Sequence, residues 1–122
     1  MAKWIDIPKF TDMRGSLVVI QDILPFKIQR VYWMFDVVGV RGGHRHKSTI
    51  QGLVCVKGKC RVNINNGKTR SIWNLDSPNQ LLLVDVADWH TMDEFSADAV
   101  LLVFASEKYD QSDYIDEDYS ND

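Results

Sequence analysis

The chain has 122 residues, which corresponds to about one domain and is long enough to bury a hydrophobic core without disulfide bonds. Its hydrophobic content of 45% and charged content of 25% are ordinary for a globular protein. The net charge of −3 gives no support for nucleic-acid binding, and no apolar run approaches the length of a membrane span. The first residues lack the apolar core of a signal peptide, so we expect a cytoplasmic protein.

The predicted elements are short β-strands separated by turns, and no segment shows the sustained apolar period of an amphipathic helix. Strands follow from runs of β-branched, aromatic and alternating apolar residues, which are in chain order 17–20, 27–38, 49–56, 60–64, 69–75, 81–84 and 99–104. The runs 81–84 and 99–104 are continuously apolar, which indicates strands buried on both faces.

Turn signals recur at intervals of roughly eight to twelve residues, the spacing typical of an all-β sandwich or barrel. They include Lys57-Gly58, Asn65-Asn66-Gly67 and Asp76-Ser77-Pro78-Asn79. We therefore expect residues 1–122 to form a single all-β barrel domain. It ends in a short acidic tail, from about residue 112, that forms one turn of helix or stays loose.

Two cysteines, Cys55 and Cys60, each lie inside an apolar strand-like run with a glycine turn between them. Such a turn brings the two thiols near each other, but a cytoplasmic protein favours two small buried thiols over a disulfide. Further thiols or histidines at zinc-finger spacing are missing from the sequence.

The histidine pair His44 and His46 follows a double glycine, with Arg45 between the two histidines. Alternate residues of a β-strand point to the same face. In an extended segment both imidazoles therefore lie on one face, and Arg45 points to the other. Two imidazoles on one wall suit either a metal site or proton transfer near neutral pH.

A metal site is one interpretation of the histidines, because a close pair plus the distant His90 is the smallest set for a three-histidine centre. Metal sites of this kind usually add a glutamate shortly after the second histidine, but residues 48–51 contain no carboxylate. This favours acid–base chemistry or ligand binding. A third interpretation is that the histidines are hydrogen-bonded on their strand and have no function.

Cationic and aromatic side chains offer further candidate contacts for a ligand. Arg14 and Arg41 each precede a glycine, which lets the backbone approach a phosphate that the guanidinium binds through two nitrogens. Lys47 adds a third cation, and together they suggest a diphosphate or carboxylate partner. Tyr32, in the predicted strand 27–38, is a candidate general acid if it lies near an imidazole.

Six motifs occur in order along nearly the whole chain: RGSL at 14–17, KIQRVY at 27–32, RGGHRHK at 41–47, LDSP at 75–78, WH at 89–90 and ASxxYDxxDYI at 105–115. This series resembles the sugar 3,4-ketoisomerases of the cupin superfamily, also described as WxcM-like. The resemblance implies a cupin, a jelly-roll β-barrel, that forms a homodimer, often with exchanged N-terminal strands. It also implies a dTDP-linked 4-keto-6-deoxyhexose as the bound partner.

The resemblance further implies an isomerase that moves the keto group from C4 to C3 by proton transfer, without a metal or other cofactor. Carried over by position, His44 is the base at C3, His46 its neighbour in the proton path, and Tyr32 lies near the reacting carbons. The implied substrate-binding residues are Arg14, Arg41, Lys47, Gln51 and His90. Arg14 and His90 together resemble the branch whose product is the galacto-configured 3-keto sugar, used in surface polysaccharides such as O-antigen and S-layer glycans.

Some positions differ from the pattern of that family. The residue between the two histidines is usually small, and here it is Arg45. Glutamates common in the family are replaced by Ile50 and Thr91, and a tyrosine is replaced by Leu83. Two alternatives therefore remain beside the isomerase: a cupin that binds a nucleotide sugar without chemistry, and a metal-dependent cupin enzyme that uses the three histidines.

Overall fold

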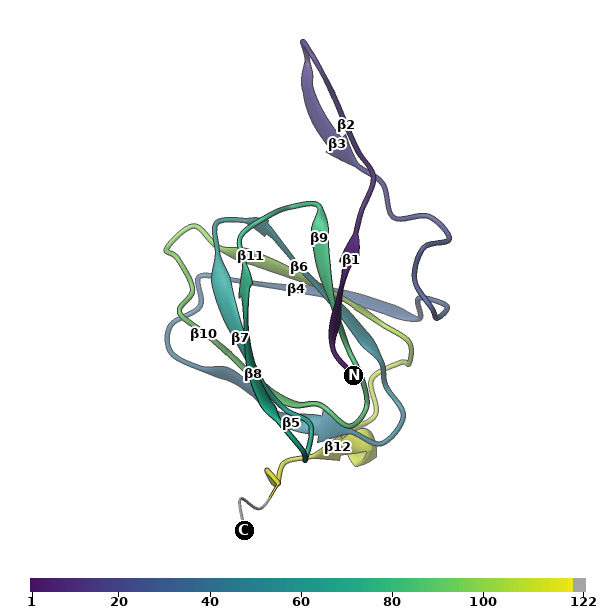
Figure 1. Cartoon of the computed structure of the whole chain (residues 1–122), viewed down its shortest axis with the longest axis vertical. Coiled ribbons are helices and arrows are strands. Elements are labelled where there is room, and N and C mark those ends of the chain that lie inside the picture. The colour runs from purple at the N-terminus through teal and green to yellow at the C-terminus, as the bar shows by residue number, and fades with distance from the viewer. Residues whose placement is uncertain (120–122) are drawn as a thin grey trace.

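The computed structural model describes residues 1–119, which form a barrel of two facing antiparallel β-sheets (Figure 1). The first five-stranded sheet has the spatial order β1 (Lys3–Asp6), β9 (Gln80–Val84), β6 (Gln51–Lys57), β11 (Val100–Ala105) and β4 (Arg30–Phe35). The second has the order β12 (Tyr114–Ile115), β5 (Arg41–His46), β10 (Trp89–Asp93), β7 (Cys60–Asn65) and β8 (Arg70–Leu75). A short 3-10 helix, η1 (Gln111–Asp113), precedes β12.

The chain passes back and forth between the two sheets, as in a jelly roll. β4, β6, β9 and β11 belong to the first sheet, whereas β5, β7, β8 and β10 belong to the second. The inward side chains of both sheets meet in one core, to which Leu53, Leu82 and Leu101 contribute from the first sheet and Val62 and Leu75 from the second. The expected all-β cupin barrel is confirmed.

β9 is the most completely buried strand, as its apolar run predicts. Leu82 and Val84 belong to the core between the sheets. Leu81 and Leu83 belong to a second apolar cluster, which partly buried residues between Val18 and Phe26 help to form. The same expectation for 99–104 is wrong for one face of β11, since Leu102 and Phe104 are only partly buried there.

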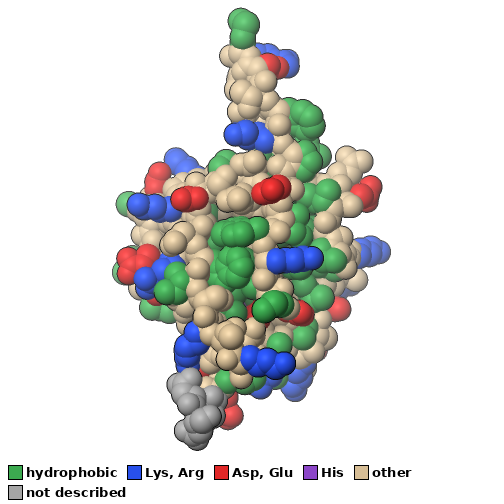
Figure 2. All heavy atoms as spheres, viewed as in Figure 1, with side chains coloured by type: hydrophobic (Ala, Val, Ile, Leu, Met, Phe, Trp, Pro, Cys, Tyr) green, Lys and Arg blue, Asp and Glu red, His purple; other side chains and the backbone are tan. Residues whose placement is uncertain are grey.

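A two-stranded hairpin, β2 (Lys9–Asp12) and β3 (Gly15–Val18), stands clear of the barrel as a narrow arm (Figures 1 and 2). Its strands pair with each other and with no further strand among residues 1–119. Phe10 is 60% exposed and Leu17 is 57% exposed, although both are large apolar side chains. The arm therefore carries apolar surface that the barrel of its own chain does not cover.

Every predicted strand is present, and the segment 41–46, considered only as possibly extended, forms β5. Four further strands were not predicted: β1, β2, β10 and β12. The predicted tail forms the turn η1, followed by β12. Its last residues, 120–122, lie outside the described residues. The expectation of unbridged thiols is confirmed, because Cys55 and Cys60 are both buried and free. Within residues 1–119, no helix has the length and apolar character that crossing a membrane requires.

Candidate active site

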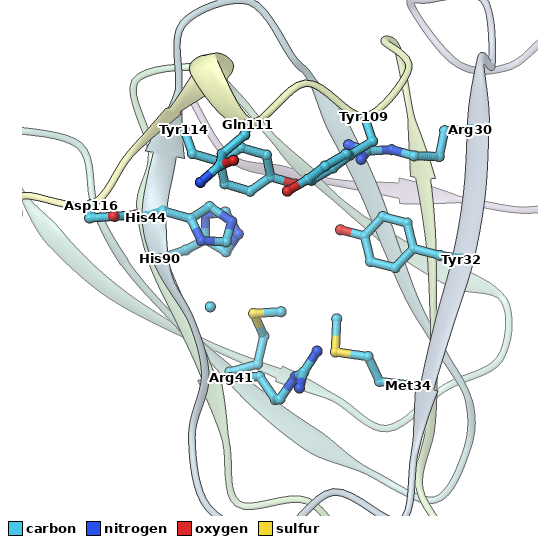
Figure 3. A pocket seen from close by; sticks show the side chains of 12 residues that line it. Arg30, Tyr32, Met34, Arg41, His44, His90, Tyr109, Gln111, Tyr114 and Asp116 are labelled. Carbon is cyan, nitrogen blue, oxygen red and sulfur yellow. The ribbon is translucent and has the colours of Figure 1, made fainter.

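A cavity of about 580 Å³ opens between the two sheets, beside the C-terminal segment (Figure 3). The opposite walls come from β4 of the first sheet and from β5 and β10 of the second. The segment around η1 supplies a third wall. The lining residues are Arg30, Tyr32, Met34, Arg41, Gly42, His44, His90, Met92, Tyr109, Gln111, Tyr114 and Asp116.

Gly42 explains why a double glycine precedes the histidine pair. The register between β5 and β10 shifts between His90 and Thr91, so that His44 lies directly opposite His90. At Gly42 the backbone has φ +83°, and a Cβ there would lie 2.9 Å from the carbonyl oxygen of His90. Only glycine fits this conformation and this close approach, which bring the two histidines together.

His44 lies at the centre of a cluster of rings. Its ring centroid is 5.0 Å from that of His46, 5.3 Å from that of His90 and 4.6 Å from that of Tyr114. Burial, and then the neighbouring His90 and His46, lower the pKa of His44 to about 4. The imidazole is therefore unprotonated at neutral pH and has a nitrogen available to accept a proton.

His46 lies next to His44, but its ring is buried and does not line the cavity. Its Nδ1 is 2.8 Å from the carboxylate oxygen Oδ2 of Asp113, which belongs to η1. Burial lowers the pKa of His46, and the Asp113 carboxylate opposes that shift. Its other nitrogen, Nε2, is buried and has no hydrogen-bond partner among the described residues.

His90 completes the cluster from β10. The residue is 1% exposed, and its Nδ1 is 2.9 Å from the backbone oxygen of Asp88. Burial lowers its pKa to about 4, so it is a neutral side chain at pH 7. Although the three imidazoles are close, residues 1–119 contain no group of three or more His, Cys, Asp or Glu side chains placed to hold a metal ion.

Tyr32 points into the cavity from β4, with its hydroxyl directed toward the histidines (Figure 3). The side-chain amide of Gln51 donates to this hydroxyl at 2.9 Å. Burial and the neighbouring Tyr114 raise the pKa of Tyr32, against the opposing effect of Arg30. The phenol is therefore protonated at neutral pH. Because its oxygen already accepts from Gln51, its own proton is available to a ligand.

Two arginines line the cavity, and neither forms an ion pair with a carboxylate of residues 1–119. Arg41 was predicted to bind the substrate, and it lies at the floor of the view in Figure 3. Arg30 was not predicted. Its guanidinium carbon lies 5.3 Å from the ring centroid of Tyr32 and 5.6 Å from that of Tyr109. Both guanidinium groups are therefore available to an anionic ligand.

The predicted site residues occupy three kinds of position. Tyr32, Arg41, His44 and His90 line the cavity, and His46 and Gln51 are buried directly behind lining residues. The remaining two lie outside it. Lys47 is exposed and meets the site only through its backbone N–H, which donates to Asp113. Arg14 lies at the turn of the hairpin arm, with 90% of its side chain exposed, and pairs with Asp12.

Arg45 points away from the cavity, as strand alternation predicts. Its guanidinium carbon lies 4.5 Å from the ring centroid of Tyr119, near the end of the described chain. The hydroxyl of Tyr119 donates to the backbone oxygen of Ala87 at 2.7 Å. Arg45 thus helps to hold the C-terminal segment against the second sheet.

Sequence reasoning missed the contribution of the C-terminal segment. Tyr109, Gln111, Tyr114 and Asp116 line the cavity, and Asp113 contacts His46. The sequence predicted only that an acidic tail from about residue 112 forms one turn of helix or stays loose. The available signal was the motif ASxxYDxxDYI at 105–115, which has more aromatic character than a solvated tail and contains the acid that meets His46.

Comparison with known proteins identifies the relatives of this fold and site. The family model FdtA, described as WxcM-like, C-terminal, matches residues 1–121. A TDP-4-oxo-6-deoxy-alpha-D-glucose-3,4-oxoisomerase from Aneurinibacillus thermoaerophilus is 47% identical over 117 residues, which are 93% of this chain and 84% of that protein.

Solved structures give the same relationship. A 3,4-ketoisomerase from Helicobacter canadensis has a TM-score of 0.91 at 33% identity, over 95% of this chain and 90% of that chain. A mutant of the 3,4-ketoisomerase QdtA from Thermoanaerobacterium thermosaccharolyticum, in complex with TDP-4-keto-6-deoxyglucose, has a TM-score of 0.92 at 32% identity, over 95% and 87% of the two chains. The chain belongs to the FdtA family of WxcM-like C-terminal cupin proteins.

Proposed function

We propose that the protein is an isomerase that moves the keto group of dTDP-4-keto-6-deoxyglucose from C4 to C3. The observation that carries the proposal is the pair of groups that face each other across the cavity. Unprotonated His44 can accept a proton, and protonated Tyr32 can donate one. The relatives named as 3,4-ketoisomerases or 3,4-oxoisomerases support the same reaction.

The reaction consists of two proton transfers at carbon and two at oxygen. His44 removes the proton from C3, the C3–H electron pair forms the C3=C4 double bond, and the C4 oxygen takes a proton from Tyr32. The C3 hydroxyl of the enediol then gives its proton to the Tyr32 phenolate as the ketone forms at C3, and C4 receives a proton from protonated His44, so both side chains regain their starting states. No redox partner is needed, because the product is an isomer of the substrate. Tyr32 also stabilises the oxygen on which negative charge develops.

The diphosphate of the substrate is the natural ligand of the cavity cations. Arg41 and Arg30 line the cavity without a carboxylate partner among the described residues. A guanidinium binds phosphate oxygens through two parallel N–H groups. Holding the nucleotide fixes the sugar against His44, and such positioning supplies much of the rate of an intramolecular proton transfer.

We further propose that the product is dTDP-3-keto-6-deoxygalactose. This follows from the family resemblance at Arg14 and His90. His90 pairs with His44 in the β10–β5 ladder, and both residues line the cavity. A 3-keto sugar of this configuration is a precursor of 3-amino-3,6-dideoxygalactose in surface polysaccharides.

A homodimer accounts for the position of Arg14, which lies on the arm and outside the cavity of its own chain. Phe10 and Leu17 give the arm an exposed apolar surface. β4 is an edge strand of the first sheet and carries exposed Trp33 and Phe35. We propose that the arm of each subunit crosses to its partner, covers such apolar surface and brings Arg14 to the partner's cavity.

Solvent deuterium provides the test of the activity. Purified protein with dTDP-4-keto-6-deoxyglucose in D2O should incorporate deuterium into the sugar and form a 3-keto product, both observed by NMR. His44→Asn should abolish exchange, because an amide cannot act as the base that the imidazole provides. Calorimetry should still detect binding of the nucleotide sugar to this variant. Saturable binding without exchange in the wild-type protein would instead support a binding module. Activity that requires a metal, found by elemental analysis, would support the metal-dependent alternative.

A further inference from the structure

Asp113 is a buried carboxylate surrounded by hydrogen-bond donors. Its Oδ1 accepts from the backbone N–H groups of Lys47 and Ser48 and from the Ser48 hydroxyl, at 3.1, 2.8 and 2.9 Å. Its Oδ2 accepts from the Thr49 hydroxyl at 2.5 Å and lies 2.8 Å from Nδ1 of His46. Burial alone would raise the pKa of Asp113, but these donors together hold it below its usual range.

The protonation of Asp113 determines the tautomer of His46. An ionised carboxylate can only accept, so Nδ1 of His46 must carry the proton that lies between the two groups. In the neutral imidazole, Nε2 then has a lone pair and no proton. This nitrogen is buried and meets no hydrogen-bond partner among residues 1–119. A buried acceptor without a protein partner is rare in folded proteins, and a catalytic role is one of the explanations for it.

We propose that Asp113 is a positioning residue for the isomerisation: it fixes His46 with the proton on Nδ1, so that Nε2 remains a proton acceptor beside His44. The proposal rests on the proposed function. The ring of His46 is perpendicular to that of His44, with centroids 5.0 Å apart. If the two rings close to hydrogen-bond distance when substrate binds, a proton that His44 takes from C3 can pass to Nε2 of His46, leaving His44 neutral again. Asp113 stabilises the imidazolium that forms, and the proton returns through His44 to C4.

Asp113 also joins this arrangement to the wall of the cavity. It belongs to η1, between the lining residues Gln111 and Tyr114. Directly after it, Tyr114 pairs with His46 in the β12–β5 ladder. The segment that encloses a bound sugar is therefore the segment that sets the tautomer of His46. A displacement of this wall would remove the acceptor from the proton path.

The tautomer can be measured without substrate. In wild-type protein labelled with 15N-histidine, long-range 1H–15N spectra should show His46 with a protonated Nδ1 and an unprotonated Nε2. A His46→Gln variant identifies the signals. In Asp113→Asn the preference should be lost or reversed, because an amide can both donate and accept. Protonated Nε2 in the wild-type protein overturns the proposal, whether or not Asp113→Asn folds.

The kinetic test separates positioning from a general effect of the turn. Asp113→Asn should lower kcat by about 100-fold with KM little changed, because the proton path is affected and sugar binding is not. Asp110→Asn is the matched control: it removes the same charge from the same turn, where the Asp110 carboxylate accepts from the backbone N–H of Ser112 and caps η1. This control should retain wild-type kcat. Equal losses in both variants, or wild-type kcat in Asp113→Asn, overturn the proposal. Absence of exchange in the wild-type protein would instead refute the proposed function and leave the tautomer measurement valid.

Discussion

Tyr32 and His44 show how two residues acquire complementary roles from their surroundings. Both are removed from water, and burial favours the neutral form of each: the protonated phenol and the unprotonated imidazole. A neutral donor therefore faces a neutral acceptor at neutral pH. Gln51 also orients the phenol. Its amide donates to the Tyr32 oxygen, so the phenolic proton is free to be donated to a ligand.

Removing the phenolic hydroxyl tests this division of roles. Tyr32→Phe keeps the ring, so binding of the nucleotide sugar should remain. Without a proton donor at the C4 oxygen, kcat should fall by about 100-fold or more, a typical loss for a general acid. Steady-state kinetics, with the thermal midpoint as a control for folding, measure both effects. Wild-type kcat in Tyr32→Phe would show that another group protonates the sugar.

The sequence predicted the directions of the side chains within β5, but it did not predict which residues they contact from other parts of the chain. His44, His46 and the outward Arg45 follow from strand alternation alone, since alternate side chains share a face. Asp113 does not follow from it. Its contact with His46 joins positions 67 residues apart, and a run of acids near a chain end usually marks a solvated segment.

The hairpin arm is the element that its own chain explains least. Exposed Phe10 and Leu17 gain nothing from the barrel beside them. β2 was not predicted from the sequence, because a four-residue strand such as Lys9–Asp12, with charged ends and no buried face, lacks the pattern of a core strand. The exposed apolar side chains of the arm are explained if a second subunit covers them, as in the proposed dimer.

Mixing two inactive variants tests whether the arm serves the partner's cavity. Arg14→Ala and His44→Asn should each lose activity alone. After the two are unfolded and refolded together, about half of the dimers are mixed, each with one complete site, so about a quarter of wild-type activity should return. The control pair is His44→Asn with Tyr32→Phe, both in one cavity, which should not recover. Failure of the first pair to recover would place Arg14 outside the partner's site.

For the whole molecule, the buried histidines make stability depend on pH. His90 has a folded-state pKa of about 4 against an ordinary value of 6.5, and the same direction holds for His44. Between these values the unfolded chain binds more protons than the folded chain, so acid favours unfolding. For His90 alone the difference corresponds to on the order of 3 kcal/mol, lost as the pH falls from about 6.5 to 4.

Thermal unfolding across this range measures the effect. The midpoint should fall steadily as the pH decreases from 7 to 4.5, and His90→Gln should show a smaller dependence on pH whatever its absolute stability. Below pH 4 the loss should continue, because Asp113 has a lowered pKa in the folded state and its stabilisation disappears on protonation. A midpoint that is constant between pH 7 and 5 would contradict the assigned protonation of the histidines.

The all-β barrel could be predicted because its core strands carry their own signals, such as the apolar run of β9 and the Gly67 turn after β7. β10 and β12 could not. β10 is short and alternates polar with apolar residues, and its central Thr91 hydrogen-bonds Asn63 across the sheet. β12 has two residues and depends entirely on pairing with β5.

The position of η1 and β12 near the end of the chain has a consequence for biosynthesis. A ribosome delivers β1 to β11, and with them His44, His90 and Tyr32, before it delivers Asp113, Tyr114 and Asp116. Two walls of the cavity are therefore synthesised before the third. A product truncated before Gln111 would retain every strand of the two five-stranded sheets except β12 and would lack the residues of the third wall from Gln111 onward.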